Sequence, residues 1–416
     1  MVGDTRGAAA FGTQPIPVGG AQLFNGFVAR LDLVGNVQWV RYLAPVGSGL
    51  ETLMQGLALD AAGNAVVAGS YRNGSLTLGT STLPANANPA FTNGVVAKLD
   101  PAGNVLWAQS LTEPNASVGV TAVAVDASGT AYTVIPSHAV PLRQGLGLRT
   151  FLAAGVPGPG HDFPGVSGDA ATSPFGVYAG IDKLVVNPRT GQLGAMGVFQ
   201  GILTLRAAGV AGPGLAFTSP PEPRTGVYVM GLDAAGTPQW AQELTSTGFS
   251  QNGQTGSFYN QLNGIAPTCT GFAVAGSYLG AGRLAGTALL GSAASNNTTA
   301  VVARFDGQGQ LQWSKTVSGD GNPGSGALAY ALATDAAGQV HVAGAFAGQL
   351  AANGEGFISA GGLACCCCTI PTRANCRAAN ATAATATSTP ARWSSTPLAS
   401  PGWRAQSWAR AALGAW

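Results

Sequence analysis

Four near copies of one stretch decide the fold: FVARLDLVGNVQW (27–39), VVAKLDPAGNVLW (95–107), VYVMGLDAAGTPQW (227–240) and VVARFDGQGQLQW (301–313). Their tryptophans, Trp39, Trp107, Trp240 and Trp313, are 68, 133 and 73 residues apart. Because 133 is close to twice the shorter step, a degenerate copy is expected between Trp107 and Trp240. One structural unit is therefore repeated along the chain.

A second stretch alternates with the first. It reads GLALDAAGNAVVAGSY (56–71), AVAVDASGTAYTVIPS (122–137), GIAPTCTGFAVAGSY (264–278) and ALATDAAGQVHVAGAF (331–346), with a divergent version at 182–199. Its closing glycine is Gly3, Gly69, Gly197, Gly276 and Gly344, and Ile135 takes that place in one unit. Six units are thus expected within residues 1–363, starting near 1, 56, 120, 176, 263 and 328. The first and last are incomplete, and one second hairpin is unrecognisable between 136 and 226.

Both stretches join two apolar runs through Asp-x-x-Gly-x, the pattern of a β-hairpin with a tight turn. Two hairpins per unit make a four-stranded antiparallel blade, and blades repeated around an axis make a β-propeller. The sequence therefore predicts an all-β propeller of about five to six units. The period exceeds that of compact blades, and the excess lies in Gly- and Pro-rich connections such as 72–94.

The aspartates three residues before a glycine could suggest catalysis or calcium binding, but the turn explains them better. Asp accepts backbone N–H groups at the first turn position, and Gly at the fourth adopts the left-handed backbone. No copy continues into the spacing of a calcium loop. The tryptophans are expected to fill space between blades, with ligand stacking as the alternative. The structural positions are Asp32, Gly35, Asp60, Gly63, Asp100, Gly103, Asp126, Gly129, Asp233, Gly236, Asp306, Gly309, Asp335 and Gly338, besides the four tryptophans.

The D-x-x-G-N and V-A-G-[ST]-Y stretch paired with F-V-A-[RK]-L-D and G-N-V-x-W resembles the bacterial seven-bladed β-propeller repeat of the SBBP type, over residues 1–363. The resemblance implies an exported or cell-surface protein, in many cases one sent out by type IX secretion, with a binding or adhesion role. It supplies no catalytic residue. No signal peptide is visible at Met1, which taken alone would indicate a cytoplasmic protein. Because the first unit begins halfway through, we expect this chain to be a fragment of a longer parent protein with the extracellular location that the resemblance implies.

Composition limits the partners. Charged residues are 9% of the 416, against about 25% in ordinary soluble domains, and the net charge of +2 comes without a Lys/Arg cluster. Nucleic acid binding therefore has no electrostatic support. The apolar runs are strand-sized, well short of the ~18 residues of a membrane helix. A polysaccharide or protein partner held by the loops between hairpins is the expectation, with no membrane span.

The chain changes character at residue 364. Residues 364–416 hold no Asp, Glu or Lys, yet they carry five of the six cysteines and four of the eight tryptophans. Four adjacent cysteines, Cys365 to Cys368, cannot all point at one zinc ion, so no metal site is expected. Reading the codons of 368–376 in another phase can restore part of the repeat. We therefore expect an out-of-frame, irregular and disordered tail.

Few residues offer chemistry. His341 lies inside an expected strand, which favours a packed or solvent-facing role, and His138 lies in no motif. His161 and Asp162 lie in a Gly/Pro loop (GVPGPGHDFPG) and are the weak candidates for a polar binding site. The expected function is a non-enzymatic secreted or surface scaffold with no catalytic residue, no metal and no cofactor. The alternatives are a propeller enzyme that binds pyrroloquinoline quinone, since LDPAGNVLW is similar to its repeat, and a truncated remnant without function.

Overall fold

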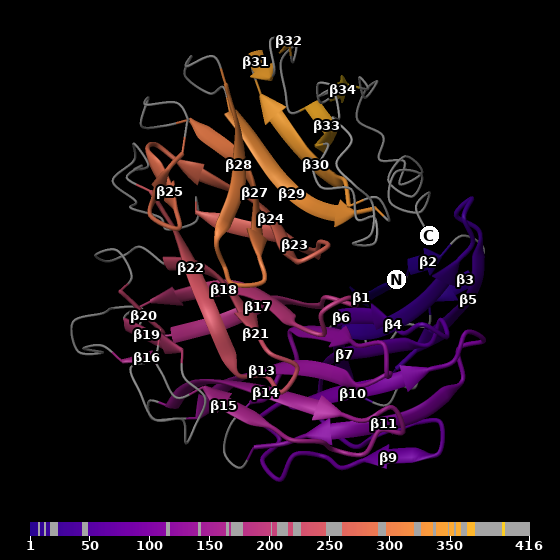
Figure 1. Ribbon diagram of the computed structural model, residues 1–416. Coiled ribbons are helices and arrows are strands. Elements are labelled where there is room, and N and C mark those ends of the chain that lie inside the picture. Colours follow the sequence, from indigo (N-terminus) through magenta and orange to yellow (C-terminus); the bar gives the residue numbers. More distant parts are fainter. Residues whose placement is uncertain are drawn as a thin grey trace, which may run out of the picture.

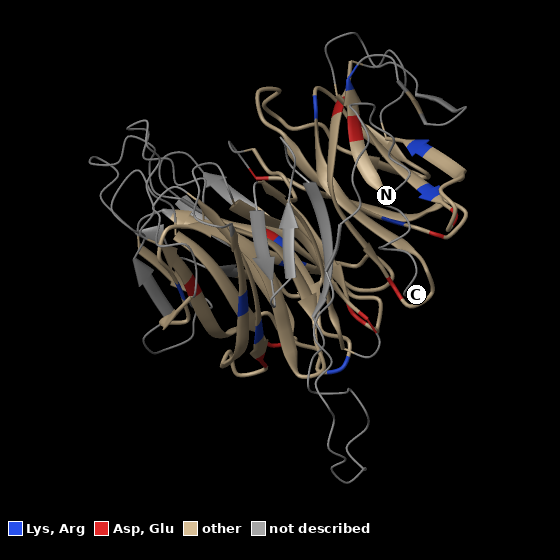
Figure 2. Cartoon of the chain, turned by 90° about the horizontal axis from the view of Figure 1, so that it is seen from above, with Lys and Arg blue, Asp and Glu red and all other residues tan. Residues whose placement is uncertain are grey.

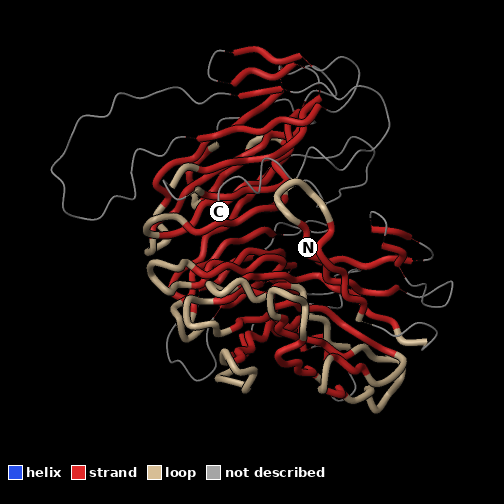
Figure 3. The backbone as a smooth tube through the Cα atoms, turned by 90° about the vertical axis from the view of Figure 1, so that its right-hand side faces the viewer, coloured by secondary structure: helices blue, strands red, loops and turns tan. Residues whose placement is uncertain are grey.

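The computed structural model describes residues 1–6, 9–11, 14–16, 24–43, 49–113, 117–139, 143–163, 166–167, 178–200, 202–205, 215–218, 226–246, 260–289, 297–319, 326–335, 338–347, 349–352, 355–358, 364–370 and 393–395. Within these ranges every regular element is a strand, as Figure 3 shows. None of the described segments is a helix that could cross a membrane. The predicted all-β propeller of antiparallel blades is confirmed.

Six antiparallel sheets follow one another around a centre (Figure 1). Blade I has three strands, β1 (Val2–Arg6), β4 (Phe24–Leu31) and β5 (Val37–Tyr42). Blade II comprises β6 (Glu51–Leu59), β7 (Ala65–Arg72), β10 (Asn93–Leu99) and β11 (Val105–Leu111). Blade III comprises β12 (Ala122–Val125), β13 (Ala131–Ala139), β14 (Arg143–Phe151) and β15 (His161–Phe163).

The other three blades repeat the same strand order. Blade IV comprises β17 (Tyr178–Val186), β18 (Leu193–Gln200), β21 (Gly226–Leu232) and β22 (Pro238–Ser246). Blade V comprises β23 (Gln261–Pro267), β24 (Gly271–Leu279), β27 (Thr298–Asp306) and β28 (Leu311–Gly319). Blade VI comprises β29 (Gly326–Thr334), β30 (Val340–Ala347), β33 (Ala364–Ile370) and β34 (Trp393–Ser395).

Short hairpins occupy the long connections. β25 (Gly282–Leu284) and β26 (Thr287–Ala288) extend blade IV, and β31 (Gln349–Ala352) and β32 (Glu355–Ile358) extend blade V. Each of these hairpins comes from the connection of the following blade, so it links two neighbours. The remaining strands form three small sheets or hairpins: β2 (Ala9–Phe11) with β3 (Gln14–Ile16), β8 (Leu76–Leu78) with β9 (Ser81–Leu83), and β16 (Val166–Ser167) with β19 (Ile202–Leu205) and β20 (Leu215–Thr218).

The core lies between consecutive blades. Val66, Val96 and Trp107 of blade II pack on Val123 and Phe151 of blade III, and similar buried clusters join the other neighbours from blade I to blade VI. Strands that are apolar on both faces are required for such packing. This explains why so many strand residues of this chain are uncharged.

The second hairpin of blade III, which could not be recognised in the sequence, is formed by β14 and β15. Its turn keeps the hydrogen bonds of the other copies: Gly155 N–H donates to Leu152 O (2.7 Å) and Leu152 N–H donates to Val156 O (2.9 Å). Leu152 stands where the other units have Asp, and no tryptophan follows it. The hairpin was therefore hidden from pattern recognition, although a degenerate copy was expected in this region.

Two segments of the tail that the sequence predicts to be irregular are strands. β33 pairs with β30, with Val342 opposite Cys368, and β34 pairs with β33. In blade II the tryptophan Trp107 lies opposite Lys98, and the counterpart of Lys98 in blade VI is Thr369. Trp393 lies opposite Cys368 instead, so the tail tryptophan is shifted by one register position. The rest of the tail lies outside the described residues, and its out-of-frame origin stays a prediction.

Candidate functional site

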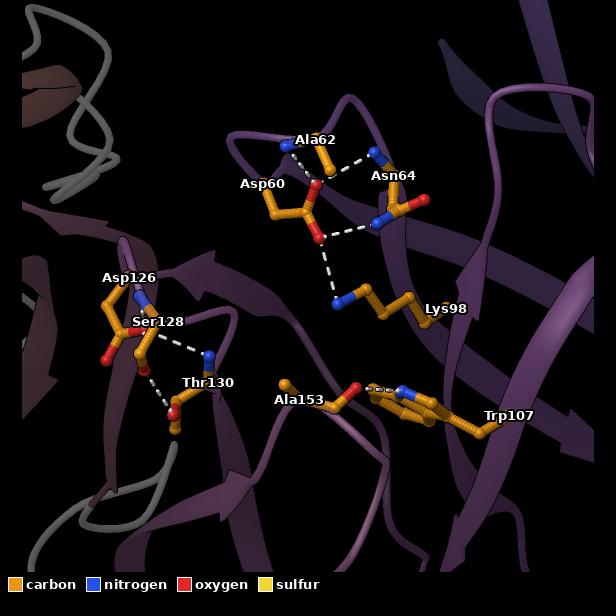
Figure 4. A network of polar contacts seen from close by, with 9 residues as sticks. All are labelled: Asp60, Ala62, Asn64, Lys98, Trp107, Asp126, Ser128, Thr130 and Ala153. Atoms are coloured by element: carbon orange, nitrogen blue, oxygen red, sulfur yellow. Dashed lines mark hydrogen bonds and ion pairs between the residues drawn. The ribbon is translucent and has the colours of Figure 1, made fainter.

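Each Asp-x-x-Gly turn uses its carboxylate as an internal hydrogen-bond acceptor. In blade II, Asp60 Oδ1 accepts the backbone N–H groups of Ala62 and Asn64, both at 2.9 Å (Figure 4). The same two-amide pattern occurs at Asp32, Asp100, Asp126, Asp233 and Asp306, and Asp335 accepts one amide from Gln339. The turn glycines Gly35, Gly63, Gly103, Gly129, Gly236, Gly309 and Gly338 all have φ between 76° and 91°, the left-handed region.

The second carboxylate oxygen is occupied as well. Asp60 Oδ2 lies 2.9 Å from Lys98 Nζ, and both side chains are buried. Burial by itself raises the pKa of Asp60, but hydrogen bonds from Lys98 and Asn64 outweigh it and lower this pKa to about 2. Hydrogen bonds from Asn36 and Asn104 lower the pKa of Asp32 and of Asp100 in the same way. These three carboxylates thus act as hydrogen-bond acceptors within the scaffold.

The repeated tryptophan holds the turn of the next blade. Trp107 Nε1 donates to Ala153 O at 3.0 Å (Figure 4). Gln109 Nε2 donates to Gly155 O, also at 3.0 Å. Trp240 and Gln242 bind Gly307 O and Gly309 O in the same way, at 3.0 Å each. In the first junction Trp39 binds Pro101 O (3.0 Å) and Arg41 Nε binds Gly103 O (3.2 Å). We call this arrangement the tryptophan clamp.

Glycine is required in a clamped turn for a second reason. A Cβ atom at Gly103, Gly155 or Gly309 would lie 2.9, 2.5 or 2.5 Å from the indole of Trp39, Trp107 or Trp240. The indole therefore stacks directly on the turn backbone. Trp313 lies opposite Arg304 in the clamp register, and the turn that would follow it is outside the described residues.

The histidines have ordinary surroundings where the structure describes them. His161 lies on β15, two residues beyond the place where other units have tryptophan, and a Cβ atom at Gly236 would be 3.0 Å from its ring. It thus contacts the turn of blade IV that a clamp would hold. His341 Nε2 lies 3.2 Å from Asp335 Oδ2, a turn carboxylate. The side chains of His138 and Asp162 lie outside the described residues.

A depression of about 630 Å³ lies between the turns of blades I and II. Its polar lining is already engaged, because Arg30 Nη1 and Trp39 Nε1 both donate to Pro101 O and Gln38 donates to Asp32. Charged residues of both signs are spread over the described strands and turns, as Figure 2 shows. Among the described residues, no three metal-ligating side chains come together.

A feature that sequence reasoning missed lies at the centre of the ring. The innermost strands of blades II, IV, V and VI each contain a β-bulge, whose extra residue is Gln55, Asp182, Asn263 or Tyr330. The carbonyl two residues before each extra residue occupies the space where the next strand would need a Cβ atom, so that strand carries glycine: Gly69, Gly197, Gly276 and Gly344. This explains the closing glycine of the repeat, and it was the available sequence signal for a bulge.

Two side chains at this position connect neighbouring blades near the centre of the ring. Asn263 Nδ2 donates to Ala329 O of blade VI at 2.7 Å. Blade III has Ile135 in place of the closing glycine, and the paired part of β12 has no bulge. Thr121 takes the place of the extra residue there, and its hydroxyl donates to Ile181 O of blade IV at 2.9 Å. In both cases the acceptor is the carbonyl just before the next bulge residue. Figure 1 shows β6, β17 and β23 close to the centre of the ring.

Asp182 breaks this pattern, because a carboxylate can only accept hydrogen bonds. Its side chain is accessible to solvent yet enclosed by protein, and this desolvation raises its pKa, against the opposing charge of Lys183. Tyr228 lies close by: burial and then the charge of Asp182 raise the pKa of its hydroxyl, which donates to Gly180 O at 3.0 Å. We give the name channel site to the residues at this position of the five blades: Gln55, Thr121, Asp182, Asn263 and Tyr330.

A second carboxyl with a raised pKa lies away from the channel. Glu243 is on β22, the outermost of the four core strands of blade IV, and burial raises its pKa to about 7. Its Oε1 atom is buried without a hydrogen-bond partner. Burial accounts for this shift, so we interpret Glu243 as a structural carboxyl and not as part of the channel site.

Comparison with known proteins gives a fold and no family. No family model and no curated protein matches the chain. One similar solved structure is the periplasmic gluconolactonase PpgL of Pseudomonas aeruginosa, with 14% identity over 84% of this chain and 77% of that one and a TM-score of 0.35. Another is the gluconolactonase XC5397 of Xanthomonas campestris, with 16% identity over 73% of this chain and 82% of that one and a TM-score of 0.25. A third is the dihydro-heme d1 dehydrogenase NirN, with 11% identity over 84% of this chain and 75% of that one and a TM-score of 0.28.

These comparisons correct one expectation. The sequence predicts a non-enzymatic binding or adhesion scaffold, whereas the solved proteins to which this chain is similar are enzymes. At such identities and TM-scores the likeness concerns the fold alone and assigns neither a reaction nor a substrate. Any reaction must therefore be inferred from the channel site itself.

Proposed function

We propose that this protein is a propeller enzyme that binds a small hydroxylated ester or lactone at the channel site and hydrolyses it with Asp182 as general base. The observation that carries the proposal is the acceptor-only carboxyl of Asp182. At that position Thr121 and Asn263 donate a hydrogen bond to the next blade. A residue that breaks a local rule without a structural gain is a mark of function.

The chemistry requires a proton acceptor that works near neutral pH. Enclosure by protein raises the pKa of Asp182, which makes its carboxylate a stronger base than that of an ordinary surface aspartate. Asp182 takes a proton from a water molecule, whose oxygen attacks the ester carbonyl. When the C–O bond to the alcohol breaks, the protonated carboxyl returns this proton to the departing alkoxide. The half-exposed Tyr330 and the amide of Asn263 offer hydrogen bonds to substrate hydroxyl groups.

The test is hydrolysis of a panel of aldonic lactones and short aliphatic esters by the full chain, followed by pH-stat titration of the acid released. We expect Asp182→Asn to lower kcat/KM by about 10²-fold or more, the usual contribution of a general base. Asp100→Asn is the matched control, since it makes the same chemical change in a turn carboxylate and should keep the activity. If no panel member is hydrolysed, or if D182N is as active as the unmodified chain, the proposal fails.

We also infer that the chain is of the SBBP repeat type and acts outside the cell. The recurring D-x-x-G turns, the bulge glycine and the clamp tryptophan support this, because all three coincide with the stretches that carry the resemblance. A polysaccharide or protein partner at the connections stays part of this proposal. Cell fractionation with an antibody against the chain tests it, and recovery in the cytoplasmic fraction alone would refute it.

A further inference from the structure

The turn of blade I, Asp32–Gly35, is built like the clamped turns of its neighbours. Gly35 N–H donates to Asp32 O (3.1 Å), and Asp32 Oδ1 accepts the N–H groups of Val34 and Asn36. The φ of Gly35 is 91°, close to the 83° of Gly103 in the clamped turn of blade II. The carbonyl groups of Leu33 and Gly35 therefore have the same geometry as those of Pro101 and Gly103, which a clamp binds.

None of the described residues forms a clamp at this turn. A Cβ atom built on Gly35 would have nothing within 4 Å, whereas an indole lies within 2.9 Å of the same point at Gly103, Gly155 and Gly309. In the described part of the chain no side chain donates to Leu33 O or Gly35 O. Leu33 and Val34 are 67% and 73% exposed, the two highest values among the large hydrophobic residues described. Such exposure of apolar side chains beside unused acceptors is typical of an interaction surface.

We propose that the Asp32–Gly35 turn is a docking surface for a propeller blade of another polypeptide, whose outer strand carries Trp and, two residues later, Gln or Arg. The indole would stack on Gly35 and donate to Leu33 O, while the amide or guanidinium would donate to Gly35 O. The complementarity comes from the three clamps in this molecule, which all have this donor set. A second copy of this chain cannot supply any of these three, because each holds its own next blade.

The first experiment measures binding of a cyclised hairpin peptide to the full chain. The peptide has the sequence of residues 226–246, contains Trp240 and Gln242, and is closed by cysteines added at its ends. Isothermal titration calorimetry should detect binding to the unmodified chain, and at least ~tenfold weaker binding of a peptide with Trp240→Ala and Gln242→Ala. No detectable binding of the first peptide would overturn the proposal.

Two glycine variants separate docking from turn strain. Gly35→Ala places a Cβ atom where the indole must stack, so we expect at least ~tenfold weaker binding. Gly63→Ala is the matched control: its φ is 78°, its neighbourhood is also open, and it lies in a turn that meets no clamp. Binding weakened equally by G63A would overturn the proposal. If the chain self-associates and Trp313→Phe abolishes this self-association, the partner is a second copy of this chain, and the proposal of a different polypeptide is overturned.

Discussion

Blade V has a buried cation, Arg304, at the position of Lys98 in blade II, but it lacks a counterpart of the Asp60 carboxylate that pairs with Lys98. Arg304 lies opposite Ala273 as Lys98 lies opposite Val66, but Thr268 stands where blade II has Asp60. Arg304 is 7% exposed, and its Nε atom has no hydrogen-bond partner. Burial lowers the pKa of its guanidinium, which is the direction that desolvation of an unpaired cation produces. We therefore expect that Thr268→Asp will stabilise the protein.

The magnitude follows from the missing hydrogen bond. A buried donor without a partner costs about 1–3 kcal/mol, and the pair formed at position 268 recovers this minus the cost of burying a carboxylate. We expect a net gain of about 1 kcal/mol, seen as a rise of about 1 °C in Tm for a chain of this size. Asp at this position can also accept the N–H group of Gly271, as the hydroxyl of Thr268 does at 3.2 Å.

The assay is thermal unfolding followed by circular dichroism for a double-mutant cycle. Thr268→Asp should raise Tm in the unmodified chain and lower it when combined with Arg304→Met, because the new carboxylate is then buried alone. Thr268→Asn, similar in size and without charge, is the control and should give less than half the gain. Stabilisation by T268D that is equal in both backgrounds would refute the assignment of Arg304 as an unpaired counterpart of Lys98.

Three further changes test the scaffold. Gly276→Ala puts a Cβ atom onto the carbonyl oxygen of Gln261 and should cost about 3 kcal/mol or more in urea unfolding, whereas Gly119→Ala, with open space around it, should be near neutral. Trp240→Phe keeps the ring but loses the clamp hydrogen bond, so a loss of about 1–2 kcal/mol is expected in the same assay. Glu243 has a folded-state pKa of about 7, above its ordinary 4.5, so the folded state binds the proton more tightly. Stability should therefore fall as pH rises from about 4.5 to 7 and level off above, and Glu243→Gln should remove this slope in Tm measured against pH.

The repeat made the blades predictable because each hairpin is determined locally. An apolar run, Asp-x-x-Gly and a second apolar run specify a turn and the two strands beside it, whatever the rest of the chain does. The hairpin of blade III was missed because Leu152 cannot form the side-chain bonds of Asp, and only Gly155 keeps the turn. The β14–β15 pair is held by its backbone bonds and by packing between blades, and neither leaves a short motif.

The candidate site was beyond local patterns for a different reason. A bulge adds one residue to a strand, and TLMQGLAL (52–59) does not show which residue is extra until its pairing with the next strand is known. The glycine inside VAGSY was the indirect sign, since glycine within an apolar strand indicates close approach of another backbone. His161 was predicted from its loop-like surroundings, but Gly and Pro there belong to a strand connection, and its ring contacts a neighbouring turn.

Departures from the repeat concentrate at the junction of blades III and IV, and this supports the placement of the channel site. Blade III has Ile135 in place of the bulge glycine and Leu152 in place of the turn aspartate, and it lacks the clamp tryptophan. Thr121 and His161 replace the lost contacts on the channel side and at the rim, so the junction is held by different means and not simply weakened. Asp182, the carboxyl that donates nothing, lies directly beside the carbonyl that Thr121 binds. A repeat maintained for stability alone would have a donor there, as in the neighbouring units. The exchange of a stabilising bond for an exposed carboxyl is the kind of loss that an active site explains.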